Sequence, residues 1–147
     1  MKLNEIQSKI FYHGSEIELP VGTILKASND YENRWQDNNF YQILEKFRPS
    51  NQLSHKQCVF MCDNPDDLDA AGGGTEWVFT LKPLGIVQKH DMNWGSEIDC
   101  LVSDGFSVDS PAVQKAAENY WNSIPHTNES LWEYLTLKAQ ILKVEPF

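Results

Sequence analysis

The stretch Ile10-Phe11-Tyr12-His13-Gly14-Ser15 is an apolar run that ends in a histidine, a glycine and a hydroxyl. Its apolar residues predict a buried strand that ends at His13. Gly14 then allows a turn, or the close approach of a ligand to the backbone, because glycine has no Cβ. An imidazole, a bare backbone and a hydroxyl thus meet at one strand end. Such a group suits a planar polar ligand, although the pattern is short.

Composition and charge limit the kinds of protein that this chain can be. With 147 residues, 41% of them hydrophobic, we expect a single domain over residues 1–147 with one core. Acidic residues number 21 against 12 basic ones, which gives a formal net charge of -9. Such a surface repels phosphates on average, which argues against a nucleic-acid partner. An acidic protein that imitates nucleic acid and occupies a basic partner remains an open alternative.

The sequence predicts a protein of the cytoplasm, without membrane or metal. No stretch reaches the roughly 18 apolar residues of a membrane helix, and the start lacks the apolar run of a signal peptide. Cys58, Cys62 and Cys100 have apolar neighbours and are odd in number, so we expect buried thiols in a reducing compartment. The spacing of Cys58 and Cys62 lacks the second pair or the histidines of a zinc site.

In the first half of the chain, apolar spacing predicts a helix over 37–48 that Pro49 stops. A buried strand over 58–62 follows, and then a short helix that begins near Asn64 and ends at the glycines 72–74. These glycines lack the surroundings of a phosphate-binding motif, so a flexible connection is the preferred interpretation. Residues 28–36 read as a polar loop.

The second half is more helical. Strands over 76–81 and 86–89, separated by a turn, predict a hairpin-type pair. A helix or a helical turn follows over 96–102, a clearer helix runs from Pro111 to Asn122, and a final strand covers 138–144. This order of strands and helices favours an α+β fold over a doubly wound parallel sheet.

Two groups of residues are candidates for chemistry. One is His13-Gly14-Ser15, and the other is Glu133, with Glu129 four residues earlier, just before the last predicted strand. Taken separately, a histidine at a strand end usually bonds a backbone carbonyl, and a glutamate is usually solvated or caps a helix. Taken together, they indicate a polar site built from both ends of the chain.

Three short motifs resemble the ADP-ribosyltransferase superfamily. They are Tyr12-His13-Gly14-Ser15, the strand 58–62 followed at once by an acidic helix start, and Glu133-Tyr134-Leu135 before a terminal strand. The order of elements resembles the branch of diphtheria toxin and the poly-ADP-ribose polymerases, described by a His-Tyr-Glu trio. The resemblance implies an α+β fold with a split antiparallel β-sheet, flanking helices and a cleft that binds NAD.

The resemblance also implies roles for individual residues. His13 would hydrogen-bond the nicotinamide ribose, and the backbone of Gly14 would contact the nicotinamide amide. Ser15 would support the turn or contact the adenylate side. Glu133 would hold the ribose 2′-hydroxyl and stabilise the positive charge that develops on the sugar as nicotinamide leaves.

The middle position of the trio departs from the family pattern. The family places an aromatic side chain there, and Phe60 is the nearest aromatic, although strand alternation is equally consistent with a core position. Tyr31, Trp35 and Tyr41 are the alternatives for a face that stacks on nicotinamide. Ser54 precedes the strand, as a serine does in the arginine-modifying branch of the superfamily.

The function implied is that of an NAD-dependent mono-ADP-ribosyltransferase, a glycosyltransferase that releases nicotinamide. NAD is its co-substrate, and no metal is expected. The acidic charge favours a protein acceptor, a basic one in particular, although Arg34, Lys46, Arg48 and Lys56 form a local basic group. The small size favours a stand-alone toxin, effector or modifier. The alternative is a non-catalytic acidic binding protein, of this or another α+β fold, that blocks a partner protein.

Overall fold

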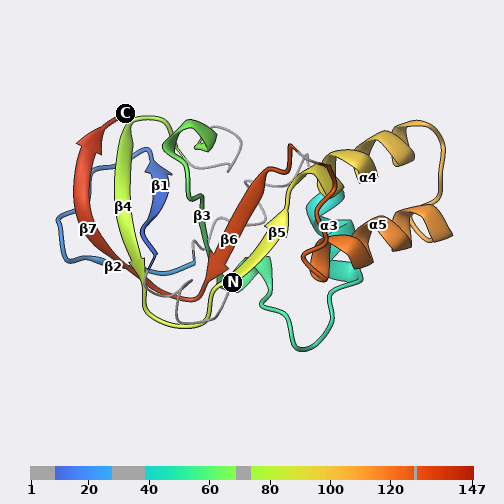
Figure 1. The fold of residues 1–147 in the computed structure, drawn as a ribbon, viewed down its shortest axis with the longest axis horizontal. Helices are drawn as coiled ribbons and strands as arrows, with labels where there is room; N and C mark the ends of the chain where they lie inside the picture. The colour runs from blue at the N-terminus through green and yellow to red at the C-terminus, as the bar shows by residue number, and fades with distance from the viewer. Residues whose placement is uncertain (1–8, 28–38, 69–73, 128) are drawn as a thin grey trace.

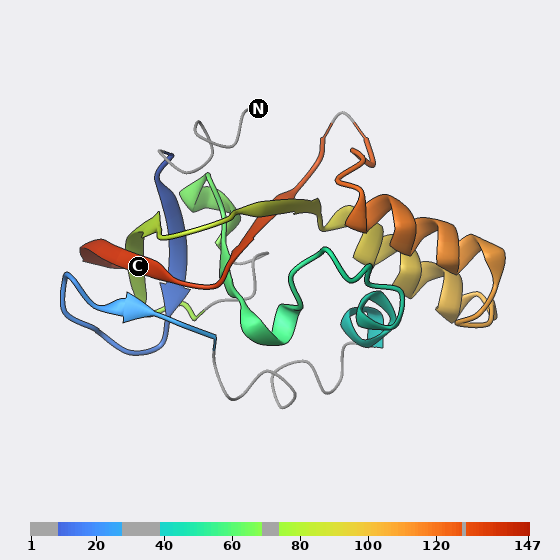
Figure 2. The same cartoon turned by 90° about the horizontal axis from the view of Figure 1, so that it is seen from below.

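The computed structural model describes residues 9–27, 39–68, 74–127 and 129–147 (Figure 1). Over these residues the fold is α+β, with three α-helices and two antiparallel sheets, one of which curls into a half-barrel. The three helices gather at one end of the molecule, beyond β5, in both views (Figures 1 and 2).

The larger sheet has the strand order β1-β4-β7-β2. Its strands are β1 (Phe11–Ser15), β4 (Trp77–Pro83), β7 (Ala139–Pro146) and β2 (Ile24–Leu25). His13 lies opposite Phe79 where β1 pairs with β4. The apolar core of the sheet includes Phe11, Phe79, Leu81 and Ile141, all at most 1% exposed.

The smaller sheet has the order β3-β6-β5, with β3 (Val59–Met61), β6 (Trp132–Thr136) and β5 (Gln88–Asp91). A bridge between Tyr12 and Cys62 joins it to the larger sheet. The amide of Tyr12 donates to the Cys62 carbonyl at 2.8 Å, and the amide of Cys62 returns the bond at 3.0 Å. The strands β1, β3 and β6 are therefore neighbours, although they come from both ends of the chain.

The helices are α3 (Asn39–Lys46), α4 (Asn93–Ser103) and α5 (Pro111–Trp121). The hydroxyl of Ser110 accepts a hydrogen bond from the Val113 amide at the start of α5, and Pro111 fits the first turn. Apolar spacing then buries one face of α5, and the indole of Trp121 donates to the Leu44 carbonyl at 2.8 Å. This packing holds Tyr120 of α5 against the strands of the smaller sheet.

Several predictions from the sequence are confirmed. The helices expected over 37–48, 96–102 and 111–122 appear as α3, α4 and α5, and the strand expected over 58–62 appears as β3. The terminal strand is also present. The loop predicted over 28–36 lies outside the described residues.

Other predictions are wrong. The first strand does not end at His13 but continues to Ser15, because pairing with β4 continues as far as Trp77. Strands β4 and β5 do not form a hairpin but lie in different sheets, since residues 84–87 carry the chain from one sheet to the other. Glu133 precedes the last strand, β7, as predicted, but it lies inside a further strand, β6, that was not predicted.

Smaller corrections concern a helix start and a thiol. The helix expected from Asn64 is, in the described residues, the three-residue 3-10 helix η2 (Pro65–Asp67), with the Asn64 side chain as its cap. Cys58 and Cys62 are buried as expected, but Cys100 is exposed on α4. No helix in the described ranges is long and apolar enough to span a membrane.

Replacement of Gly14 by alanine should destabilise the protein. A Cβ at Gly14 would lie 2.2 Å from the backbone carbonyl oxygen of Gly74, which cannot move without shifting the chain. We expect Gly14→Ala to lower the free energy of unfolding by about 1–3 kcal/mol, as overpacking does. Chemical denaturation of Gly85→Ala is the matched control, because no described atom lies within 4 Å of a Cβ there. Equal stability of the two variants would contradict the close contact.

Candidate functional site

Glu133 is the centre of a buried polar cluster. Its side chain is on β6, and the residue is 0% exposed. The hydroxyl of Tyr41, from α3, donates to Oε2 at 3.2 Å, and the hydroxyl of Tyr120, from α5, is in hydrogen-bond contact with Oε1. His55 belongs to the 3-10 helix η1 (His55–Gln57), and its Nε2 lies 4.0 Å from Oε1. Side chains from three elements thus converge on one carboxyl group of β6.

The alternation of β6 explains why Glu133 faces the helices. Glu133 pairs with His90 of β5, and two residues later Leu135 pairs with Phe60 of β3. Side chains at alternate positions share a face, so Glu133 and Leu135 lie on the side of Tyr41 and Tyr120. Tyr134 points the other way and packs against Phe11 of β1, with ring centroids 4.8 Å apart.

A second carboxylate, Glu45 of α3, extends the cluster. Its Oε1 accepts hydrogen bonds from the His55 amide at 2.6 Å and the Ser54 hydroxyl at 3.0 Å, and Arg48 pairs with Oε2 at 3.1 Å. The Nδ1 atom of His55 lies 3.2 Å from the same Oε1, an electrostatic contact. Burial raises the pKa of Glu45, but the contacts with His55 and Ser54 outweigh it and hold the pKa at about 2. Glu45 is therefore ionised.

The environment acts in the opposite direction on Glu133. Burial raises the pKa of its carboxyl group, and the nearby His55 together with the two tyrosine hydroxyls lowers it only in part. Burial thus shifts Glu133 toward the neutral acid, whereas the contacts of Glu45 shift that residue toward the carboxylate.

His90 is a further buried titratable group beside Glu133. It is 0% exposed, its Nδ1 lies 2.8 Å from the Tyr120 carbonyl, and its ring stacks on the Tyr120 ring at 4.4 Å. Burial lowers the pKa of His90 to about 4, with the Tyr120 carbonyl opposing and His55 adding to the shift. His90 is therefore neutral at physiological pH.

His13 joins the two sheets near the Tyr12–Cys62 bridge. Its Nδ1 lies 2.7 Å from the carbonyl oxygen of Phe60, and its ring stacks on Phe79 with centroids 6.2 Å apart. A carbonyl only accepts, so Nδ1 carries a proton. A hydrogen bond from a histidine to a backbone carbonyl is the ordinary role expected for His13 from the sequence. The bond also places the His13 ring beside β3.

Gly14 has a close backbone neighbour, as its lack of a Cβ allows. Its carbonyl accepts a hydrogen bond from the Gly74 amide at 3.0 Å. The backbone groups of one strand residue point to one edge, and those of its neighbour to the other. Because Tyr12 bonds Cys62 of the neighbouring sheet, the Gly14 amide points to the same edge of β1, toward β3.

The remaining predicted site residues have clear local roles. The hydroxyl of Ser15 donates to the Ile17 carbonyl at 2.7 Å and accepts from the Ile17 amide at 3.1 Å, so it supports a turn. Ser54 caps η1 and bonds Glu45. The ring of Phe60 lies nearly parallel to that of Tyr41, with centroids 6.1 Å apart, and edge-on to His55.

The structure brings some of these residues together and separates others. Phe60 and Glu133 share the helix-covered face of the smaller sheet, whereas His13 continues the face of Phe11, on the opposite side. The strands that carry His13 and Glu133 are two positions apart, which corresponds to about 10 Å. His13 reaches this region through its contact with the Phe60 backbone. Tyr31 and Trp35 lie outside the described residues.

Sequence reasoning missed His55, Tyr120, Glu45 and His90. His55 follows a capping serine, and Tyr120 lies in the apolar stripe of a helix, where its ring reads as core. The available signal was a hydroxyl inside a buried helix stripe, since a buried tyrosine needs a hydrogen-bond partner. Among the described residues, no three His, Cys, Asp or Glu side chains are grouped as a metal would require.

Comparison with known proteins adds no family to these observations. No protein-family model matches the chain, and no curated protein matches it at a significant level. The interpretation of the cluster therefore depends on its own geometry.

Acid should destabilise the protein through His90. In the unfolded chain His90 titrates near 6.5, whereas in the folded protein its pKa is about 4, so unfolding binds a proton between these values. Its contribution is present above pH 6.5 and is lost as the pH falls to about 4, by at most about 3 kcal/mol. We expect His90→Gln to show a flatter dependence of unfolding free energy on pH in this window. His126→Gln, at a partly exposed histidine, is the control. Parallel curves for wild type and His90→Gln would contradict the assignment.

Proposed function

We propose that the chain is an NAD-dependent mono-ADP-ribosyltransferase that releases nicotinamide and transfers ADP-ribose to a protein. The observation that carries this proposal is the strand arrangement. His13, Phe60 and Glu133 lie on β1, β3 and β6, which are consecutive neighbours where the two antiparallel sheets join. This adjacency of β1, β3 and β6 agrees with the split sheet that the motif resemblance implies. The order of the strands along the chain does not by itself require the adjacency.

In the proposed reaction, Gly14 and Glu133 each act on one part of NAD. The amide of Gly14, which points toward β3, donates to the nicotinamide amide, and His13, from the opposite face, positions the Phe60 backbone through its contact with the Phe60 carbonyl. Glu133 in its ionised form holds the ribose 2′-hydroxyl and stabilises the cation formed as the bond to nicotinamide breaks. Such stabilisation is strong in a buried site, where water does not screen the charge.

Access to Glu133 requires Tyr41 to move. The hydroxyl of Tyr41 occupies Oε2, and its ring covers Phe60. Both contacts are of the kind that NAD would make, a hydroxyl on the carboxylate and a flat ring over Phe60. In this proposal Tyr41 therefore holds the place of the nicotinamide riboside in the free protein.

The acceptor is proposed to be a protein with a basic surface. The net charge is -9, and two cations of the basic group named from the sequence are already paired, Lys46 with Asp109 and Arg48 with Glu45. A surface of this kind attracts a basic protein and repels nucleic acid.

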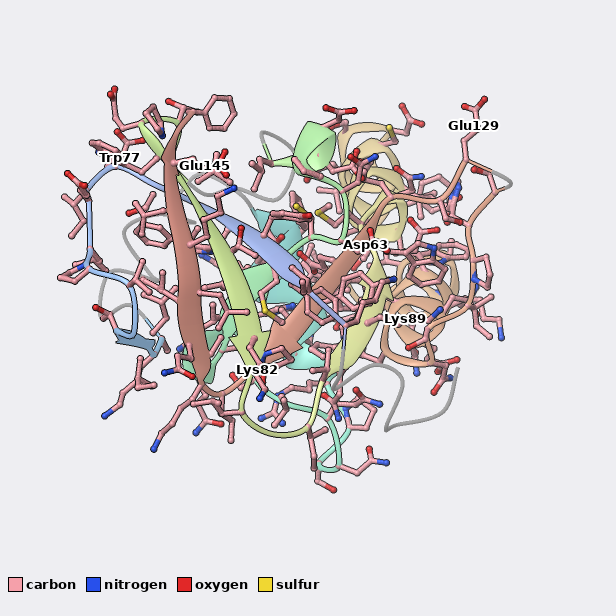
Figure 3. The ribbon with its side chains drawn as sticks, turned by 60° about the vertical axis from the view of Figure 1, so that its left-hand side comes forward. Asp63, Trp77, Lys82, Lys89, Glu129 and Glu145 are labelled. Carbon is pink, nitrogen blue, oxygen red and sulfur yellow. The ribbon has the colours of Figure 1, made fainter. Side chains whose placement is uncertain are left out.

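Glu133→Gln should abolish the transfer while preserving the fold. Glutamine has nearly the same shape but no negative charge, so we expect the release of nicotinamide from NAD to fall about 100-fold or more. The measurement is labelled NAD incubated with the protein and a cell extract, followed by nicotinamide release and acceptor labelling. Glu129→Gln is the matched control, because Glu129 is exposed before β6 and points away from the fold (Figure 3). Nicotinamide release by Glu133→Gln at the same rate as by Glu129→Gln would contradict the role of Glu133 in the reaction.

The burial of Glu133 favours a second candidate function. Its carboxyl is 0% exposed and bonded to two tyrosines, as in a polar group that serves the fold alone. The chain would then be a non-catalytic acidic protein that blocks a basic partner by its charge of -9.

Salt dependence distinguishes this second candidate. A binding protein of this kind should retain its partner in pull-down without NAD, and retention should decline steeply between about 50 and 500 mM salt as charges are screened. The matched bait is Glu133→Gln, which should retain the partner as well as wild type does. Retention of the partner that does not change with salt concentration would count against binding by charge.

A further inference from the structure

Three buried side chains stand in a row at the centre of the cluster. His55 and Tyr120 are each 1% exposed and Glu133 is 0% exposed. The Tyr120 hydroxyl lies 2.6 Å from Nε2 of His55 and in hydrogen-bond contact with Oε1 of Glu133. The imidazole and the carboxyl group are therefore connected through one hydroxyl.

The number of protons in this row is limited by geometry. Two short contacts meet at the Tyr120 oxygen, and each needs one proton between its heavy atoms. The tyrosine supplies one proton, so the other belongs either to Nε2 of His55 or to Oε1 of Glu133. The Tyr41 hydroxyl binds the other oxygen, Oε2, and does not take part.

The carboxylate of Glu45 determines whether Nδ1, the other ring nitrogen of His55, carries a proton. Nδ1 lies 3.2 Å from Oε1 of Glu45, a carboxylate with a pKa of about 2. A lone pair on Nδ1 would face this negative charge, so Nδ1 carries a proton. Two arrangements with equal numbers of protons remain: neutral His55 with protonated Glu133, or an imidazolium with ionised Glu133.

We propose that His55 and Glu133 share a single proton through the Tyr120 hydroxyl, and that this proton rests on Glu133 in the free protein. Its transfer is balanced: the Glu133 proton passes to the Tyr120 oxygen while the Tyr120 proton passes to Nε2 of His55. The products are a Glu133 carboxylate and a His55 imidazolium, with Tyr120 unchanged. His55 and Tyr120 are positioning residues, since they act through Glu133.

The groups around the row favour the neutral resting form. His90 of β5 is neutral and adds no cation to balance a second carboxylate, and Glu45 of α3 already carries one negative charge. Arg48 is paired with Glu45. The thiol of Cys58 has its pKa raised to about 12, chiefly by burial, so it stays neutral as well. A fully buried acid beside these groups is more stable uncharged.

The shared proton gives the proposed reaction a carboxylate at the moment that it is needed. As positive charge develops on the ribose, the negative form of Glu133 becomes the favoured one, and the displaced proton moves to His55 beside Glu45. This last step depends on the proposed function, whereas the resting position of the proton does not.

Infrared and NMR spectroscopy of the free protein test the proposal without NAD. In wild type labelled with ¹³C-glutamate at neutral pH, we expect a carboxylic acid band that is absent from Glu133→Gln. We also expect ¹⁵N resonances of a neutral His55 protonated at Nδ1. The absence of the acid band, or an imidazolium at His55, would overturn the proposal whether or not the protein cleaves NAD.

Two tyrosine variants test the path of the proton. Tyr120→Phe removes the link, so both the Glu133 band and the Nε2 resonance of His55 should shift. Tyr41→Phe is the matched control, because it removes one hydroxyl from Glu133 at Oε2 and should shift the acid band while leaving Nε2 unchanged. An Nε2 resonance of His55 that does not shift in Tyr120→Phe would contradict the proposal that the two residues share a proton through Tyr120. If Glu133→Gln does not fold, the shift of the band in Tyr41→Phe assigns it to Glu133.

Discussion

The burial of the Glu133 carboxyl group is the constraint that the helical end of this protein depends on. A polar group without water must find partners inside the protein, and each missing partner costs roughly 1–3 kcal/mol. Here the partners come from α3, η1 and α5, which converge on β6 through Tyr41, His55 and Tyr120. One carboxyl group therefore determines how three helical segments dock on the smaller sheet.

The contrast between Glu133 and Glu45 shows how environment divides two identical side chains. Glu45 receives backbone, hydroxyl and guanidinium hydrogen bonds and stays ionised, while Glu133 contacts only two phenol hydroxyls and its burial raises its pKa. His55 lies between them and contacts both. In the proposed arrangement, His55 can accept a proton from Glu133 because the carboxylate of Glu45 balances the positive charge that His55 gains.

Local patterns were enough to predict most elements but not their pairing. The helical stripes around Tyr41 and Tyr120 and the apolar run 58–62 were visible in the sequence, since periodicity reports which face is buried. The partners of a strand leave no local mark in the sequence, so the strand of Glu133 is not predicted as a separate element, and β4 and β5 are predicted to pair with each other. At the site, His13, Gly14 and Glu133 were found by motif. His55 and Glu45 were not, because their partnership is created by packing between distant segments.

The order of strands has a consequence for how the chain folds during synthesis. The central positions of both sheets are filled by late segments: β6 lies between β3 and β5, and β7 lies between β4 and β2. These two strands occupy residues 132–136 and 139–146, so β5 and β2 have no paired strand, and β3 has only its bridge to β1, until translation has passed them. Contacts of such long sequence separation close slowly. On the ribosome, the earlier strands are exposed edges that chaperones or unwanted pairing can reach before the sheets are complete.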